Sequence, residues 1–200
     1  MIKWGIIGLG NMGQKFASAI KETSNSKIVG VASKDKNKIK NFKNNFNFTD
    51  LAVYNDYNEI IKDKNINAIY IATLNNTHFD LIKKCSENNK NILCEKPFTL
   101  NYDQGREVYD YISKNNVIFY EGFAYRSHPQ AKIIREIVEK NELGEIKNIQ
   151  SSFGFKVNKI KPDSRLFNKK LGGGAILDIG CYPLSILNFI YKDPNNYKFL

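Results

Sequence analysis

The chain has 200 residues, of which 42% are hydrophobic, and it carries a formal net charge of +10. This length allows one large or two small globular domains. The positive excess is mostly lysine scattered among asparagines, without the interleaved arginines and aromatic residues of a nucleic-acid surface, so we expect no nucleic-acid partner.

Cysteine usage and hydropathy exclude further classes. The three cysteines, Cys85, Cys94 and Cys181, form no Cys-x-x-Cys pair, which argues against a disulfide framework or a zinc site. No apolar run has the length expected of a membrane span, and the first residues do not form a signal peptide. We therefore expect a cytoplasmic protein with no bound metal and no membrane association.

The chain opens with a glycine motif in the context that binds dinucleotides. The run Gly8-Leu9-Gly10-Asn11-Met12-Gly13 follows a short apolar strand, Trp4–Ile7, and precedes a helical segment, Gln14–Lys21. Gly8 permits a tight turn, Gly10 lets backbone approach a pyrophosphate, and Gly13 lets the helix pack on the strand. The alternative is an ordinary strand–loop–helix connection with incidental glycines.

The second predicted strand, Lys27–Ala32, bears on the choice of cofactor. An NAD site usually places an acidic residue at the end of this strand, to accept from the ribose 2′-hydroxyl. Here the strand is followed by Ser33 and Lys34, which suit a 2′-phosphate better, while Asp35 comes one position later. We therefore expect NADP, with NAD as the alternative; the segment Lys34–Lys40 could also be only a solvated loop.

Strand-like and helix-like segments then alternate as far as Glu121. This rhythm predicts a doubly wound parallel sheet of the Rossmann type, an α/β fold, spanning residues 1–121. The segments are helical spacing within Asp50–Lys62, strand Ala68–Ala72, helix His78–Ser86, strand Asn91–Cys94, helix Tyr102–Asn115 and strand Val117–Glu121.

The rhythm changes near Gly122, where we place a domain boundary. Residues 122–200 are predicted to form a helix at Ala131–Asn141, a long strand at Glu145–Val157 and a second helix after Gly172-Gly173-Gly174. In that helix Asp178 and Tyr182 are spaced i, i+4 and therefore share one face. Alone, such residues are usually a solvated acid and a packed aromatic.

Two further runs stand out. Glu95-Lys96-Pro97 follows the strand Asn91–Cys94, at the sheet edge where ligands bind, and Pro97 fixes the backbone so that Lys96 can be aimed. Taken by itself, Lys96 would be a surface lysine before a turn. The run Tyr120–Pro129, which contains Arg126 and His128, lies at the domain junction.

Taken in order, these motifs resemble the GFO/IDH/MocA family of oxidoreductases, in the branch of glucose–fructose oxidoreductase and dihydrodiol dehydrogenase. The resemblance rests on Cys94-Glu95-Lys96-Pro97, on Gly172–Gly180 and on Tyr182, where many members have histidine. Ala32-Ser33-Lys34 is similar to the family's Ala-Ser-Arg. Thr73-Leu74-Asn75-Asn76-Thr77-His78 is similar to its Thr-Pro-Asn-x-x-His segment, but Leu74 replaces the proline, which questions the rigidity of that loop.

The resemblance implies an NAD(P)-dependent oxidoreductase that moves a hydride between nicotinamide and a carbinol or ketone of a sugar, polyol or diol. It implies that Lys96 contacts the ribose and the reacting oxygen, Tyr182 is the general acid/base, and Asp178 orients the substrate or a proton relay. Arg126 and His128 are weaker candidates. The cofactor-binding residues implied are Gly8, Gly10, Asn11, Met12, Gly13, Ser33, Lys34, Thr73, Leu74, Asn75, His78, Glu95, Lys96 and Arg126.

Length is the main departure from the family. Its members are longer, and the resemblance implies that further strands complete an open α+β sheet begun at Glu145–Val157, and that full-length relatives are homo-oligomers. Residues 122–200 would then be only the first part of a substrate domain, and we expect a truncated chain. The alternative to an active dehydrogenase is a truncated dinucleotide-binding module or pseudoenzyme without turnover.

Overall fold

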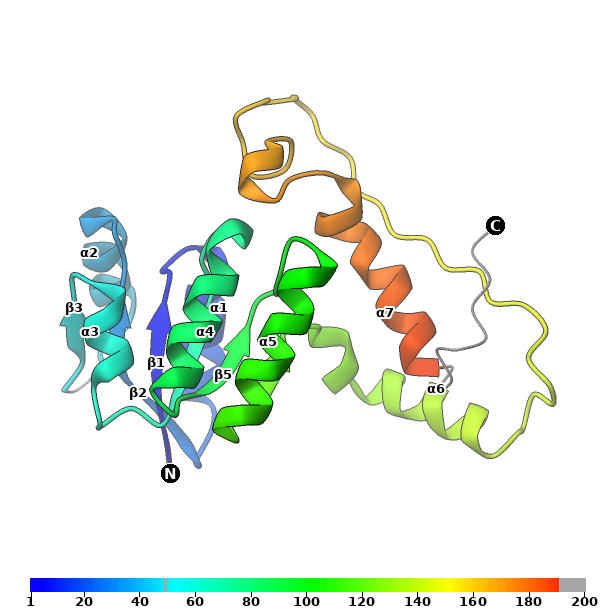
Figure 1. The fold of residues 1–200 in the computed structure, drawn as a ribbon, viewed down its shortest axis with the longest axis horizontal. Helices are drawn as coiled ribbons and strands as arrows, with labels where there is room; N and C mark the ends of the chain where they lie inside the picture. Colours follow the sequence, from blue (N-terminus) through cyan, green and yellow to red (C-terminus); the bar gives the residue numbers. More distant parts are fainter. Residues whose placement is uncertain (49, 191–200) are drawn as a thin grey trace. The chain divides into compact units, whose positions relative to one another are not determined.

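The computed structural model describes residues 1–48 and 50–190, and the chain divides into two compact units, the first being Met1–Gly122 and the second beginning at Phe123. The first unit alternates strands and helices (Figure 1). Its elements are β1 Ile2–Ile7, α1 Asn11–Lys21, β2 Ser26–Ala32, α2 Lys36–Asn45, β3 Ala52–Tyr54, α3 Tyr57–Lys62, β4 Ala68–Ile71, η1 Asn75–Thr77, α4 His78–Glu87, β5 Asn91–Cys94, α5 Tyr102–Asn115 and β6 Phe119–Glu121.

The six strands form one sheet in the order β3-β2-β1-β4-β5-β6, and all paired strands are parallel. The strand β1 is central: Ile7 pairs with Ala32 of β2 on one side and with Ile71 of β4 on the other. Successive strands are therefore added on one side of β1 up to β3 and on the other side from β4 onwards. The loops that leave β1 and β4 diverge at the carboxyl edge, where parallel sheets bind ligands. The predicted Rossmann architecture is confirmed.

Both faces of this sheet are covered, which explains why β4, in the middle of the sheet, is buried along its whole length. Figure 1 shows α3, α4 and α5 on one face and α1 and α2 on the other. Adjacent residues of β1 belong to the two cores: Ile7 packs in the cluster that contains Leu81 of α4, and Ile6 in the cluster that contains Phe42 of α2. All four of these side chains are at least 95% buried.

Two segments of the first unit differ from expectation. The lysine-rich run after β2 forms helix α2, because Asp35 caps it by accepting from the backbone N–H groups of Asn37 and Lys38. Within the segment 50–62, the short strand β3 precedes α3, so only its second half is helical. The strand β3 escapes prediction because its three residues are too few to establish an alternating pattern.

Two polar side chains, Lys90 and Tyr54, stabilise this unit through hydrogen bonds to the segment 63–66. The ammonium of Lys90 is buried and donates to the carbonyl oxygens of Asp63 (2.6 Å) and Ile66 (2.8 Å), and burial lowers its pKa. The hydroxyl of Tyr54 donates to the carboxylate of Asp63 at 2.5 Å. Burial, reinforced by that carboxylate, raises the pKa of Tyr54 to about 12.

In the described part of the second unit the regular elements are helical, and residues 140–168 form turns and irregular structure. Its elements are η2 Ala124–Ser127, α6 Pro129–Glu139, η3 Lys169–Leu171, a π-helical turn η4 Ile176–Gly180 and α7 Cys181–Ile190. The strand predicted at 145–157 is wrong for the described structure, which assigns no strand there. A strand needs a neighbour to pair its backbone N–H and C=O groups, and the described residues supply none.

One stretch of this unit contradicts the expectation that no apolar segment is long enough to span a membrane. Within the described residues, the helical stretch Lys169–Ile190 is long and apolar enough to cross a membrane by length and composition. A single stretch of this kind is weak evidence, because core helices of globular domains have the same length and composition.

Candidate functional site

The glycine motif forms an open cradle at the carboxyl end of β1. Gly8 has φ +97°, and a Cβ there would lie 2.5 Å from the carbonyl oxygen of Ala72. A Cβ on Gly13 would overlap the carbonyl oxygen of Gly8. At Gly10, by contrast, no heavy atom lies within 4 Å of the Cβ position. Gly8 and Gly13 thus allow close backbone packing in the turn, and Gly10 leaves an open space beside it.

Helix α1 points its amino end into this room. Gly10 is its N-cap and makes no side-chain capping bond, and the first turn, which begins with Asn11 and Met12, has no acidic residue. The first amides of a helix lack intrahelical partners, and the helix dipole is positive at this end. The cradle therefore fits the pyrophosphate of a dinucleotide, in both shape and charge.

The end of β2 presents a hydroxyl and a cation. The Ser33 hydroxyl is buried and accepts from the N–H of Asp35 at 3.2 Å. The exposed Lys34 ammonium lies 5.6 Å from the ring centroid of Tyr57. Asp35 lies one position after the place where an NAD site usually has its acidic residue. Its carboxylate caps α2, so it already has hydrogen-bond partners within the protein.

The loop after β4 is held by hydrogen bonds, although Leu74 stands where the similar motif has proline. Leu74 has φ −77° and ψ 145°, which are proline-like dihedrals, and its side chain is 42% exposed. Its carbonyl accepts from the N–H (2.9 Å) and the hydroxyl (2.8 Å) of Thr77, whose hydroxyl also lies 2.7 Å from that of Thr73. Asn75 is buried within this turn. Hydrogen bonds thus supply the order that proline would have supplied.

His78 lies inside the protein at the end of this loop. Its ring is fully buried, with Nδ1 at 2.8 Å from the carbonyl oxygen of Pro97 and Nε2 at 3.3 Å from that of Thr73. Burial lowers the pKa of His78, which favours a neutral ring with one N–H donor. Among the predicted cofactor residues, His78 therefore links the loops after β4 and β5.

Lys96 is half-buried in the turn that follows β5, and its peptide bond to Pro97 is cis. The preceding Glu95 extends the sheet by donating its N–H to Ile71 (2.9 Å), and its carboxylate accepts from the Tyr70 hydroxyl at 2.5 Å. Burial, aided by this carboxylate, raises the pKa of Tyr70. The Glu95-Lys96-Pro97 turn is thus fastened to β4, and Lys96 belongs to a fixed backbone.

The thiols nearby are inert. Cys85 and Cys94 are buried, which raises the pKa of both thiols, and neither forms a disulfide. No group of three metal-ligating side chains occurs within residues 1–48 and 50–190.

In the second unit, Asp178 lies inside a helical irregularity and Tyr182 lies just after it. Asp178 is 7% exposed, inside the π-helical turn η4, and accepts from the Arg165 guanidinium at 3.0 Å. Tyr182 follows on α7. The turn between them is π-helical, whereas our predicted i, i+4 relation assumed an α-helix. Such turns occur frequently at functional sites.

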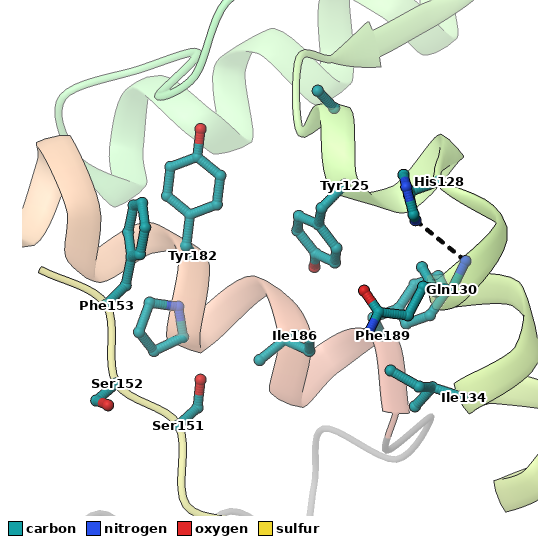
Figure 2. A pocket seen from close by; sticks show the side chains of 13 residues that line it. Tyr125, His128, Gln130, Ile134, Ser151, Ser152, Phe153, Tyr182, Ile186 and Phe189 are labelled. Carbon is teal, nitrogen blue, oxygen red and sulfur yellow. Dashed lines mark hydrogen bonds between the residues drawn. The ribbon is translucent and has the colours of Figure 1, made fainter.

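The Tyr182 ring belongs to an aromatic cluster that borders a cavity of about 610 Å³. Its centroid lies 5.0 Å from Phe153, 5.4 Å from Phe123 and 6.3 Å from Tyr125. Figure 2 shows its hydroxyl pointing away from Ser151 and from the other side chains at the cavity floor. The ring therefore forms a wall, while the hydroxyl is directed elsewhere.

Arg126 and His128 both have roles within this unit. The Arg126 guanidinium donates to the hydroxyl (3.2 Å) and the carbonyl (3.3 Å) of Ser185, whose hydroxyl lies 2.7 Å from that of Tyr125. His128 caps α6 by accepting from the N–H of Gln130 at 3.1 Å. The sequence analysis missed Ser185 and Arg165, because neither lies within a motif.

Comparison with known proteins identifies both parts of the chain. Residues 2–123 match the profile described as "Oxidoreductase family, NAD-binding Rossmann fold", GFO_IDH_MocA. Residues 132–198 match the GFO/IDH/MocA C-terminal domain.

Several curated relatives are named as dehydrogenases. The chain is 35% identical over 192 residues to trans-1,2-dihydrobenzene-1,2-diol dehydrogenase of Xenopus tropicalis, covering 95% of this chain and 57% of the relative. It is 28% identical to D-xylose 1-dehydrogenase (NADP(+)) 2 of Haloferax volcanii, with 96% and 58% covered. The chain thus spans somewhat over half the length of the curated relatives it matches.

Solved structures share the fold. An NAD-binding protein from Listeria innocua aligns with TM-score 0.76 and 25% identity over 95% of this chain and 55% of its own. A 3-ketoreductase from Actinomadura kijaniata, KijD10, solved with NADP, aligns with TM-score 0.82 and 24% identity, over 94% and 57%.

Proposed function

Because the chain belongs to the GFO/IDH/MocA oxidoreductase family, we propose that it binds NADP and catalyses hydride transfer to or from a small diol, polyol or sugar. The observation that carries this proposal is the cradle at Gly8, Gly10 and Gly13, with its open space and uncapped helix end. The relatives named as diol and xylose dehydrogenases support the substrate class.

We assign NADP specificity to the residues after β2. Ser33 and Lys34 offer a hydroxyl and an ammonium to a 2′-phosphate, and Asp35, which would favour NAD, is used to cap α2. Lys34→Ala should weaken NADP binding by about 1–2 kcal/mol and leave NAD binding unchanged. Lys40→Ala, in the same lysine run, is the control; an equal loss for both cofactors in calorimetry would contradict the assignment.

The bound nicotinamide would supply the hydride chemistry, and the protein would supply orientation and proton transfer. Lys96, on its fixed turn, is assigned to hold the ribose and to stabilise negative charge on the reacting oxygen. Tyr182 is assigned to exchange a proton with that oxygen, and Asp178 to orient the substrate hydroxyl. Glu95, His78 and Thr73 keep the loops of the first unit in place.

Cofactor binding is tested by Gly10→Asp. Aspartate is a favourable N-cap, so helix α1 should remain folded, while the carboxylate fills the open space and repels a pyrophosphate. Calorimetry should show the loss of at least a hundredfold in NADP affinity. The matched control is Gly154→Asp, which also has no heavy atom within 4 Å of its Cβ position. If folded wild type binds neither NADP nor NAD, the proposal fails.

Turnover is tested with NADP and a panel of diols, pentoses and inositols. Tyr182→Phe should lower kcat on the order of a hundredfold or more, with NADP affinity nearly unchanged. Tyr109→Phe, on the exposed face of α5, is the control. An unchanged kcat in Tyr182→Phe would assign proton transfer to another group, with His128 the next candidate.

A dinucleotide-binding module without turnover is the second candidate. The observation that favours it is the second unit, where Phe153 and Phe155 are more than half exposed on an unpaired segment. Tight NADP binding with no activity across the panel would support this alternative.

For the setting of the protein we propose a soluble enzyme of the cytoplasm that forms homo-oligomers. All three cysteines are free, which suits a reducing compartment. The apolar stretch Lys169–Ile190 lies inside the region that matches the C-terminal family domain, so we assign it to the interior of that domain.

A further inference from the structure

We propose that Arg165 is a positioning residue for catalysis: it holds the Asp178 carboxylate, and with it the π-helical turn that leads into Tyr182. This inference rests on the proposed function for its catalytic consequence, but its structural part can be tested without turnover.

The first argument is the burial of Asp178. Its side chain is a carboxylate at 7% residue exposure, and a buried carboxylate is stable only with hydrogen bonds and a compensating charge. The Arg165 guanidinium supplies both, with Nη1 at 3.0 Å from Oδ1. Removal of Arg165 would therefore take this hydrogen bond and this charge away from the Asp178 carboxylate.

The second argument is how the chain brings Arg165 to this place. Residues 161–174 form consecutive turns that fold back on the start of η4, where the N–H of Gly174 donates to Leu166 (2.9 Å) and that of Gly173 to Asn168 (3.0 Å). A Cβ on Gly173 would lie 2.8 Å from the carbonyl oxygen of Arg165. The glycine run is therefore required to bring Arg165 against η4.

The third argument is the π-helical turn itself. Its wider turns pack less well than an α-helix, so a turn of this kind persists only where other contacts hold it. Asp178 lies in the middle of this turn, with its N–H donating to Gly174 at 3.1 Å, and Tyr182 comes two residues after its end. The Arg165–Asp178 pair joins the middle of this turn to the preceding loop, and so fixes the start of α7.

The test is hydrogen–deuterium exchange of the full chain, read on the peptide covering residues 174–182. Arg165→Ala should accelerate exchange there on the order of tenfold, and 10 mM ethylguanidinium should reverse part of this change. Arg165→Lys, which keeps the charge, should lie between wild type and Arg165→Ala; it serves also if the alanine variant does not fold. The matched control is Arg135→Ala, whose guanidinium pairs with Glu139 at the same 3.0 Å.

A double-mutant cycle shows whether Arg165 acts through Asp178. In an Asp178→Asn background, Arg165→Ala should add less than twofold to exchange of the peptide. An undiminished tenfold effect there, or Arg165 variants that exchange like Arg135→Ala, would overturn the inference.

Turnover provides the catalytic readout. If wild type is active, Arg165→Ala should lower kcat tenfold to a hundredfold with KM for NADP unchanged; an unchanged kcat overturns the catalytic part. If wild type is inactive across the panel, the proposed function fails, while the exchange measurements still decide whether Arg165 holds the turn.

Discussion

The two units of this chain differ in the pairing of their backbone hydrogen-bonding groups and in the kind of side chain that they bury. In the first, every strand of a six-stranded sheet has a neighbour, and isoleucines such as Ile7, Ile69 and Ile71 are fully buried. In the second, the described buried residues include Asp178 and Ser185, each bonded to an arginine, while large apolar side chains are exposed. Apolar burial in a closed sheet holds the first unit, whereas the second combines an aromatic cluster around Tyr182 with hydrogen bonds from arginines.

This difference matters for function because the two kinds of interaction tolerate change differently. A parallel sheet closed on both faces fixes its loops, so the glycine cradle is formed before any ligand arrives. A hydrogen bond such as that from Arg126 to Ser185 depends on one side chain, so a single substitution removes it. Cofactor binding should therefore be the robust property of this chain, and the arrangement around Tyr182 the sensitive one.

The largest expected effect that tests this comparison is in amide exchange. The amides of β1 and β4 should exchange on the order of a thousandfold more slowly than those of residues 145–157, because sheet pairing protects them. Exchange monitored by mass spectrometry in dilute solution measures this. Uniform protection across both units would show that the contrast does not hold.

Core substitutions should show the same contrast in stability. Ile71→Ala removes a fully buried side chain and should cost about 2–5 kcal/mol of unfolding free energy. Phe155→Ala removes a larger side chain that is 54% exposed and should change stability by about 0.5 kcal/mol or less. Urea unfolding followed by circular dichroism compares the two; equal losses would mean that Phe155 is buried in solution.

The Tyr54–Asp63 hydrogen bond should make the first unit sensitive to pH at both extremes. The Tyr54 hydroxyl lowers the pKa of Asp63, so this stabilisation is present above pH 4 and lost as pH falls through the lowered value. The pKa of Tyr54 is raised to about 12, so stabilisation is present below pH 10 and lost as pH rises towards 12.

Tyr54→Phe should therefore cost about 1 kcal/mol at pH 7 and flatten both dependences. Urea midpoints at pH 3, 7 and 11 measure the change, with Tyr109→Phe as the exposed control. A variant with the same pH profile as wild type would show that the hydrogen bond does not contribute.

The smallest expected effect concerns Leu74. Its dihedrals already suit proline, so Leu74→Pro should raise stability by about 0.4–1 kcal/mol by restricting the unfolded chain. Thermal unfolding measures the gain. A loss of stability would indicate that the Leu74 amide or side chain makes a contact that the loop needs.

Sequence reasoning succeeded where local patterns decide structure. The segments Asn91–Cys94 and Tyr102–Asn115 were predicted with the bounds that the structure has, the first as a short apolar run and the second from apolar residues at helical spacing. The prediction of a strand at residues 145–157 failed. Apolar and polar residues alternate there as in a strand, but a strand also needs a pairing partner distant in sequence.

The same distinction applies to the candidate site. The glycine cradle could be predicted because its three glycines form one contiguous motif after a strand, and the Cβ positions at Gly8 and Gly13 show why glycine is needed there. The contact of His78 with the carbonyl oxygen of Pro97, and that of Arg165 with Asp178, could not, because these contacts join segments that no motif connects. These residues were either assigned to the cofactor directly or overlooked.

The strand order has a consequence for biosynthesis. The central strand β1 pairs with both β2 and β4, and the sheet is finished by β6 at Glu121, so the cradle needs nothing that is translated later. Amino-terminal domains fold as units while the ribosome is still adding residues. The nascent chain is therefore expected to bind its dinucleotide before Asp178 and Tyr182 have been translated.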